Sequence, residues 1–316
     1  MIVFRSPHEV PTDFGPSAVA IGKFDGVHAG HHVVLARLRE AAAAKGSRAV
    51  AVTFDRNPLA IIRPDRCPEN VVTVERKLEL LGERGLDATL LLTFDEELAA
   101  RSAESFVIDI LVNALQVSTV LVGQDFRFGY KGAGTPQLLR ELGPQYGFDV
   151  EVVDDVYLPG SERRVSSSWI RELLVEGDVA AAAKVLGRYP DVRGVVVHGL
   201  KRGRELGFPT ANLSTIVDAF VPADGVYAGW LVDHDTGIRH PSAISVGTNP
   251  TFDDVLVRQV EAHVLGETGL DLYGHDVSVE FVERLRGMVA FEGIDKLMQQ
   301  MAADVTDAAL ALGVTS

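Results

Sequence analysis

Two short segments of the sequence combine glycines with polar side chains in a way that suits the binding of phosphate groups. The first, residues 22–31, places three glycines among His28 and His31. The second, residues 203–212, places two glycines ahead of Thr210 and Asn212. Glycine lets the backbone approach a ligand closely, and the amides at the start of a helix favour an anion. The two segments therefore predict two separate phosphate chemistries.

The first segment lies where a strand is expected to turn into a helix. An apolar run at residues 18–21 precedes it, and a helix is expected over 31–44. His28 or His31 could then donate a hydrogen bond to a phosphate or to a leaving pyrophosphate. This chemistry suits nucleotidyl transfer, in which one phosphate attacks the α-phosphorus of a nucleoside triphosphate. The structural alternative is that the histidines cap the helix or fill the core.

A later segment, residues 165–171, offers further phosphate contacts. Ser167 lies at the start of a predicted helix, and Arg171 follows one turn later. A hydroxyl and a guanidinium in these positions could hold the β and γ phosphates. The alternative is a serine cap beside a surface arginine. Two clusters of basic residues without an intervening acid reinforce the phosphate hypothesis: Arg163, Arg164 and Arg171 form one, and residues 192–204 contain the other.

The second segment has the residue types of a magnesium and phosphate site. In an extended chain Thr210 and Asn212 point to the same side, and both offer neutral oxygen ligands to Mg²⁺. Gly207 would make the preceding loop pliable, while Lys201 and Arg204 could neutralise phosphates. A turn followed by an ordinary strand is the alternative.

Glu261 is the candidate base for the second site. It alternates with apolar neighbours in a strand expected over residues 259–264. A carboxylate there could accept the proton of an alcohol that is being phosphorylated. An exposed strand face is the structural alternative.

Composition narrows the class of protein. The chain has 316 residues, 47% of them hydrophobic, and a net charge of −14. This charge repels nucleic acid and anionic membranes, so neither is expected as a partner. The single cysteine, Cys67, excludes an internal disulfide. With no apolar run near the ~20 residues of a membrane span, and no signal-peptide pattern at the N-terminus, we expect a cytoplasmic protein; a weak homo-oligomer is left open.

Up to residue 186 the sequence alternates buried strands with amphipathic helices. Strands are expected at residues 18–21, 49–54, 89–92, 119–122 and 150–153. Helices are expected at residues 31–44, 74–83, 103–115, 136–146, 168–176 and 179–186. This alternation predicts an α/β, Rossmann-like domain, with a parallel sheet and helices on both faces, over residues 1–186. Ligands of such sheets gather at the carboxyl ends of the strands.

After a predicted linker at residues 187–190 the pattern changes. Short strands separated by turns are expected at residues 194–197, 226–232, 242–246, 259–264 and 277–282. Their spacing predicts an antiparallel β-barrel as a second, all-β domain over residues 187–316. The last helix carries an apolar stripe that includes Ile294, Met298 and Val305, with Asp304 on its polar side, and we expect it to pack on the barrel.

Four motifs in this order resemble the bacterial bifunctional riboflavin kinase and FAD synthetase family: residues 22–31, 123–129, 166–171 and 203–212. The resemblance extends over residues 15–308. It implies that the first domain is an FMN adenylyltransferase and the second a riboflavin kinase. ATP, riboflavin and FMN are then substrates, Mg²⁺ serves both steps, and the flavin is not a cofactor.

The same resemblance implies roles for individual residues. In the first domain it implies ATP contacts from Gly22, Phe24, Gly26, His28, His31, Ser167 and Arg171, and flavin contacts from Asp125, Phe126 or Phe128, and Asn57. In the second domain it implies nucleotide contacts from Lys201, Arg204, Gly207 and Thr210, Mg²⁺ ligands in Thr210 and Asn212, a flavin contact from Asn249, and a general base in Glu261.

The sequence departs from the family pattern at Lys23, where asparagine is common, and at Arg56 and Asn57, where the family has Pro-His-Pro. The flavin contacts of that loop are therefore open. Two alternatives follow: a chain with only one live activity, and a flavin- or nucleotide-binding regulator built on the same scaffold.

Overall fold

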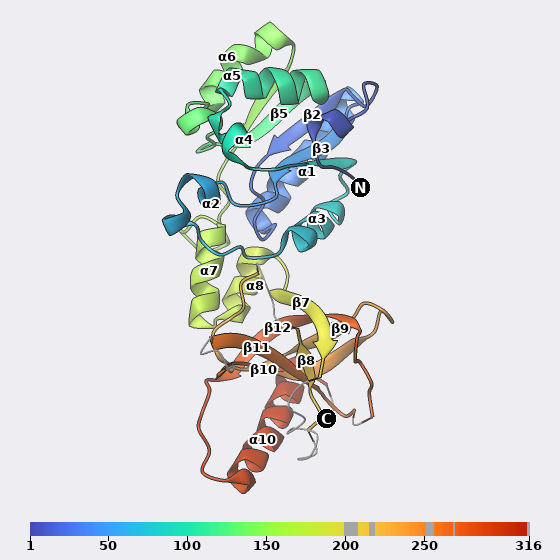
Figure 1. Ribbon diagram of the computed structural model, residues 1–316, viewed down its shortest axis with the longest axis vertical. Coiled ribbons are helices and arrows are strands. Elements are labelled where there is room, and N and C mark those ends of the chain that lie inside the picture. Colours follow the sequence, from blue (N-terminus) through green and yellow to red (C-terminus); the bar gives the residue numbers. More distant parts are fainter. Residues whose placement is uncertain (199–207, 215–218, 251–255, 268, 315–316) are drawn as a thin grey trace. The chain divides into compact units, whose positions relative to one another are not determined.

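The computed structural model describes residues 1–198, 208–214, 219–250, 256–267 and 269–314, and the side chains of 248–250 and 256–257 are not described. The chain divides into two compact units, Met1–Ser166 and Ser167–Ser316 (Figure 1). The functional boundary that we expect after residue 186 stays a prediction.

The first unit is built on a six-stranded sheet in the order β1-β4-β3-β2-β5-β6, with every pairing parallel. The strands are β1 (Ile2–Phe4), β2 (Ser17–Ile21), β3 (Arg48–Phe54), β4 (Ala88–Leu92), β5 (Val117–Gly123) and β6 (Asp149–Val153). The central strands are apolar on both faces because both faces are covered.

Helices connect these strands. They are α1 (Ala29–Lys45), α2 (Leu59–Ile62), α3 (Val74–Gly82), α4 (Glu96–Ala100), α5 (Ala103–Phe106), the π-helix η3 (Val107–Ala114) and α6 (Pro136–Tyr146), with short 3-10 turns η1 (Pro7–Glu9), η2 (Pro64–Arg66) and η4 (Tyr130–Gly132). The residues Val19 and Val52 face a core that includes Ile110 and Leu139. Along β2 the small residues Ala18 and Ala20 alternate with Val19 and Ile21. Helix α1 packs against β2, β3 and β5.

The second unit is a closed antiparallel barrel preceded by two helices and followed by one. The helices are α7 (Ser167–Glu176), α8 (Val179–Leu186) and α10 (Ile294–Leu312). The barrel order is β10-β11-β8-β7-β12-β9. Its strands are β7 (Asp191–Val197), β8 (Ala211–Leu213), β9 (Gly225–Asp233), β10 (Arg239–Pro250), β11 (Leu256–Val264) and β12 (Asp276–Arg286). The predicted fold class is thus confirmed in both parts.

The last helix packs on the barrel through the later part of its predicted apolar stripe, where Val305 and Ala308 contact the core, but the start of the stripe is exposed. Ile294 and Met298 are 62% and 39% exposed. Asp304, which the pattern places on the polar side, is instead buried and accepts hydrogen bonds from the Arg286 guanidinium at 2.8 and 2.6 Å. Ala308 and Ala309 complete the contact. A buried ion pair to β12 therefore adds to the apolar contact of α10, and the spacing of apolar residues could not reveal it.

Candidate active sites

The turn between β2 and α1 holds an unusual backbone conformation. Phe24 and Val27 adopt the left-handed region, with φ of 48° and 38°, next to Gly26 at 77°. This region is costly for a residue with a side chain, and most so for a β-branched one such as valine. Both side chains are nonetheless buried, at 2% and 0% exposure. The surrounding structure must therefore hold the turn in place.

His28 and His31 form a reciprocal cap at the start of α1. The His31 backbone N–H donates to Nδ1 of His28 at 3.4 Å, and the His28 backbone N–H donates to Nδ1 of His31 at 3.3 Å. The two rings stack with centroids 3.7 Å apart, and Phe24 meets the His31 ring edge-on at 5.1 Å. The two histidines that were expected to contact phosphate thus also form a helix cap, which was the alternative that the sequence left open.

This cap selects the same tautomer in both rings. Because each Nδ1 accepts a hydrogen bond, each neutral ring carries its proton on Nε2. Burial lowers the pKa of His31 well below its usual range, and the neighbouring His28, His32, Lys23 and Lys77 lower it further. His31 is therefore a neutral imidazole with an Nε2–H donor, which suits hydrogen bonding to phosphate oxygens and not proton abstraction.

Glycines make room for the aromatic rings of this turn. A Cβ at Gly30 would lie 3.2 Å from Cε1 and Nδ1 of the His28 ring, and a Cβ at Gly22 would lie 3.3 Å from the Phe24 ring. Lys77 of α3 reaches the same region, where its Nζ donates to the carbonyl oxygen of Phe54 at 2.7 Å. This lysine was not singled out from the sequence; its place on the buried stripe of α3 with Leu80 and Leu81 was the available signal.

The residues expected to contact the flavin in the first unit differ in how far they are exposed to solvent. Asp125 is exposed and accepts a hydrogen bond from Arg164 at 2.9 Å, so one of the basic residues expected at phosphate is engaged with carboxylates. Phe128 belongs to the core, whereas Phe126 is only partly buried and stacks on Phe128 with ring centroids 5.5 Å apart. The Asn57 side chain is buried and accepts from the Leu59 backbone N–H.

Ser167 and Arg171 lie on the first turns of α7 in the second unit. Their contact with the triphosphate of a nucleotide in the first unit stays a prediction.

The barrel brings together Thr210, Asn212 and Glu261. Glu261 on β11 is the register partner of Asn212 on β8. The Thr210 hydroxyl donates to Oε2 of Glu261 at 3.4 Å and accepts from Nδ2 of Asn212 at 3.1 Å. Thr210 and Asn212 thus point to the same side of the chain. Burial raises the pKa of Glu261, and the hydrogen bond from Thr210 opposes this shift only partly.

His263, two residues after Glu261 on the same strand, supports this group and was not singled out from the sequence. Its Nδ1 donates to the carbonyl oxygen of Pro209 at 2.8 Å, and its ring meets Phe208 at 5.4 Å. Thr210 and Asn212 also line a hollow of 60 Å³, whose other wall includes Leu270, Leu272 and Tyr273. The alternation along β11 was the signal that could have found His263.

Several expected contacts of the barrel lie outside the described residues: Lys201, Arg204 and Gly207, together with the side chain of Asn249. Arg193, part of the same basic cluster, is described. Its guanidinium donates to both carboxylate oxygens of Asp276, at 2.9 and 3.1 Å from Nε, so its charge is matched within the barrel.

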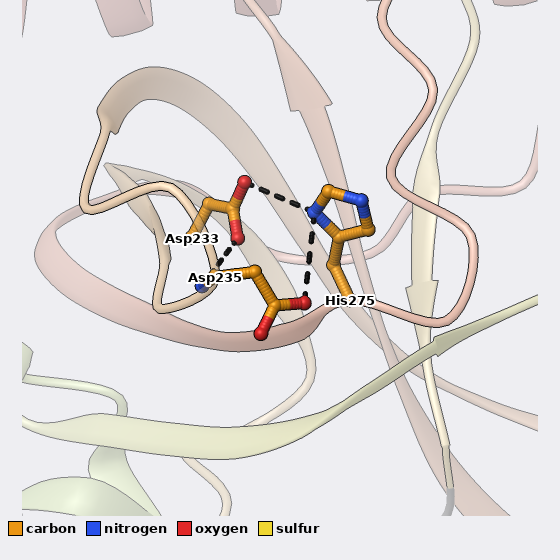
Figure 2. Close-up of side chains that lie close together, drawn as sticks. All are labelled: Asp233, Asp235 and His275. Carbon is orange, nitrogen blue, oxygen red and sulfur yellow. Dashed lines mark hydrogen bonds and ion pairs between the residues drawn. The ribbon is translucent and has the colours of Figure 1, made fainter.

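A third polar cluster joins Asp233, Asp235 and His275 at one end of the barrel (Figure 2). Nδ1 of His275 lies 3.0 Å from Oδ2 of Asp233 and 3.9 Å from Oδ2 of Asp235. The Thr236 hydroxyl and the Asp235 backbone N–H also donate to Asp233. Because protein donors already occupy both oxygens of Asp233, this cluster acts as a latch between the β9–β10 turn and the start of β12. His275 follows Leu272 and Tyr273 in the chain, so its bond to Asp233 anchors the segment that lines the hollow.

No helix in the described ranges combines the length and apolar character that crossing a membrane requires.

A parallel α/β unit with a capped histidine turn and a barrel with a Thr-Asn-Glu group define a two-domain transferase. Two family models match the chain: FAD synthetase over residues 10–169 and riboflavin kinase over residues 186–312. The chain belongs to the bifunctional riboflavin kinase/FMN adenylyltransferase family. It is a transferase of flavin biosynthesis with both activities.

Curated relatives bear the same description over their full length. The protein of Pseudomonas fluorescens called bifunctional riboflavin kinase/FMN adenylyltransferase is 36% identical over 100% of this chain and 99% of the relative. The protein of that name from Escherichia coli strain K12 is 34% identical, over 94% of this chain and 93% of the relative.

A solved structure agrees on the fold. A crystal structure described as a macrolide-efflux protein from Streptococcus pneumoniae matches with a TM-score of 0.85 and 29% identity, over 97% of this chain and 98% of that one.

Proposed function

We propose that adenylyl transfer takes place at the turn between β2 and α1. The observation that carries this proposal is the stacked pair of His28 and His31 at the N-terminus of a 17-residue helix, which follows a parallel strand. Nε2–H groups of neutral imidazoles donate to the α and β phosphates of ATP, and the helix N-terminus favours their negative charge. Gly22, Phe24 and Gly26 shape the turn around the nucleotide.

In this reaction the phosphate of FMN attacks the α-phosphorus of ATP, and pyrophosphate leaves. The protein positions the two phosphates and offsets the charge that develops on the leaving group. Ser167 and Arg171 hold the outer phosphates. Asp125 and Phe126 contact the flavin; Phe126, being only partly buried, is better placed than Phe128 to stack on its ring. Asn57 stays a candidate through its amide.

For the barrel we propose riboflavin phosphorylation at Thr210, Asn212 and Glu261. Glu261 accepts the proton of the riboflavin hydroxyl as that oxygen attacks the γ-phosphorus of ATP. Its raised pKa, caused by burial, makes it a better base than an exposed glutamate. Lys201, Arg204 and Gly207 contact the nucleotide and Asn249 the flavin, as in the family pattern.

Mg²⁺ fits the donor set of the barrel group, because the Thr210 hydroxyl and the Asn212 side-chain carbonyl are neutral oxygens beside a carboxylate. These two residues would hold it. When bound, Mg²⁺ neutralises charge on the ATP phosphates.

We also propose that the functional boundary falls after residue 186 and that the chain works in the cytoplasm, either alone or as a weak homo-oligomer. The single cysteine favours a reducing compartment.

The assignment is tested by chromatography of products after mixing the purified chain with riboflavin, ATP and Mg²⁺. We expect FMN first and FAD later, and FAD directly when FMN replaces riboflavin. Crystals soaked with a non-hydrolysable ATP analogue should show nucleotide at both groups. Nucleotide bound elsewhere would refute the site assignment without affecting the family.

A further inference from the structure

Lys77 is a buried lysine with no place in the chemistry described so far. It lies on α3 at 8% exposure, beside the buried Leu80 and Leu81. Its Nζ donates to the carbonyl oxygen of Phe54 at 2.7 Å and has a longer contact of 3.5 Å with the carbonyl oxygen of Lys23. Phe54 ends β3, and Lys23 lies in the turn after β2. Lys77 therefore joins the carboxyl ends of two neighbouring strands.

The turn that Lys77 contacts is the strained one. Phe24, the residue after Lys23, and Val27 both have left-handed backbone angles. Such a conformation is costly for a residue with a side chain and persists only where its surroundings impose it. A second bond holds the same carbonyl, since the buried Thr53 hydroxyl donates to the oxygen of Lys23 at 3.1 Å. Two donors therefore hold the peptide directly before Phe24.

The ammonium group is buried at an energetic cost that its surroundings offset only in part. Burial lowers the pKa of Lys77 to about 8, although the carboxylates of Asp25, Asp55 and Glu75 favour its charge. These carboxylates have partners of their own: Asp25 accepts from the Val71 backbone N–H, and Asp55 from the Phe94 backbone N–H, both at 2.9 Å. The hydrogen bonds of the ammonium group thus go to two backbone carbonyls, after β2 and at the end of β3, and a hydrophobic residue could not replace these bonds.

We propose that Lys77 is a positioning residue for adenylyl transfer: its ammonium group ties the turn after β2 to the end of β3 and so holds the His28–His31 pair in its capped, stacked geometry. This inference rests on the proposed site at that turn. Lys77 acts through the backbone carbonyls of Lys23 and Phe54, and its positive charge also disfavours a proton on Nδ1 of His31.

The first test compares Lys77→Met with Lys45→Met. Lys45 also donates to a backbone carbonyl, that of Ser118 at 2.8 Å, but it lies at the far end of α1. We expect Lys77→Met to lower kcat for adenylyl transfer by about 10²-fold, because misplacing reacting groups by an ångström has an effect of that size. The KM for ATP should change much less. Lys45→Met should retain wild-type rates, and the riboflavin kinase activity of the same chain should be unchanged in both.

A second measurement is independent of turnover. Titration of the His31 ring by ¹⁵N–¹H NMR should show a higher pKa in Lys77→Met than in wild type or Lys45→Met, because a positive neighbour is gone. Because that rise follows from the lost charge alone, the positioning role is tested by Lys77→Gln, which removes the same charge but keeps an N–H donor for the two carbonyls. We expect Lys77→Gln to recover part of the kcat that Lys77→Met loses, and the absence of any recovery would contradict the positioning role.

The outcomes separate this inference from the site on which it rests. Wild-type adenylyl transfer and an unchanged His31 pKa in Lys77→Met, with activity lost in His28→Ala, would overturn the role of Lys77 alone. Wild-type adenylyl transfer in both Lys77→Met and His28→Ala would overturn the proposed site itself.

Discussion

Glu261 on β11 and Asn212 on β8 face each other in the antiparallel register, and Thr210 bonds to both. A carboxylate and two neutral side chains thus meet at one pair of strands. The arrangement makes the proposed proton acceptor and the proposed metal ligands parts of a single hydrogen-bonded group.

Replacing Glu261 by glutamine should therefore remove the base while keeping the shape of the group. We expect riboflavin phosphorylation to fall by about 10²–10⁴-fold, the usual worth of a general base, and adenylyl transfer of supplied FMN to be unchanged. Steady-state rates with each substrate measure this. Glu283→Gln, at an exposed carboxyl on β12, is the matched control. Equal loss of both activities would contradict the division of labour.

The pH dependence of the kinase follows from the same residue. Glu261 must be ionised to accept a proton, and burial raises its pKa above the ordinary 4.5. The acid limb of kcat/KM for riboflavin should therefore lie above that of an exposed glutamate, with activity lost as pH falls through it. A pH–rate profile with no acid limb above 4.5 would argue against Glu261 as the base.

His28 caps α1 and has a proposed role in adenylyl transfer, and substitution can separate the two. His28→Ala removes both the cap of α1 and the imidazole, whereas His28→Asn restores a preferred capping residue and still lacks the imidazole N–H. We expect both variants to lose adenylyl transfer and keep kinase activity. The alanine variant alone should lose about 1 kcal/mol of stability, measured by denaturant unfolding. Full activity in His28→Asn would reduce His28 to a cap.

Gly30→Ala should dissociate stability from activity. Alanine is a better helix former than glycine by about 1 kcal/mol, so α1 should not be weakened. Its Cβ would nonetheless lie 3.2 Å from the His28 ring and push it aside. We expect a loss of adenylyl transfer at unchanged or higher melting temperature. An activity equal to that of the wild type would mean that the ring position is not critical.

The hydrogen bonds to Asp233 predict that the barrel loses stability at acid pH. Burial alone would raise the pKa of Asp233, but hydrogen bonds from Thr236, His275 and the Asp235 backbone together lower it. Its folded pKa lies below the unfolded value of about 3.9. Its stabilisation is then fully present above that value and is lost as pH falls through the folded pKa.

Asp233→Asn should thus be less stable than wild type near neutral pH, with the difference shrinking towards pH 3. Melting curves across this range, with Asp271→Asn as an exposed control, measure the effect. A difference that does not depend on pH would show that the carboxylate charge contributes nothing.

The elements that could be predicted are those whose signals are local. Helices α6 and α8 begin and end where their caps and periodicity indicate, because Thr135 and Asp178 cap them and Gly147 and Gly187 end them. Strand β1 was missed because three residues carry no periodicity. The helix expected over residues 103–115 is split into α5 and the π-helix η3, a change of winding that an apolar pattern does not encode.

The sites show the same division. The sequence could place Thr210 and Asn212 on one side of a strand, since alternation is a property of the extended chain. It could not pair Asp233 with His275, or Lys77 with the carbonyl of Phe54, because these partners meet only after the chain has folded. The stacking of His28 on His31 also depends on left-handed angles at Phe24 and Val27, which residue type argues against.

Strand β8 carries Asn212, one of the two proposed metal ligands, yet it spans only Ala211–Leu213. It shares two residue pairs with each neighbour, through Val196 and Val197 on β7 and through Glu261 and Ala262 on β11. Among the described strands of the barrel, β8 has the fewest paired residues, so its backbone amide hydrogens should exchange fastest. Substrate that contacts both β8 and β11 would stabilise the pairing of these two strands. The barrel should therefore grow more rigid at the moment when it is ready to react.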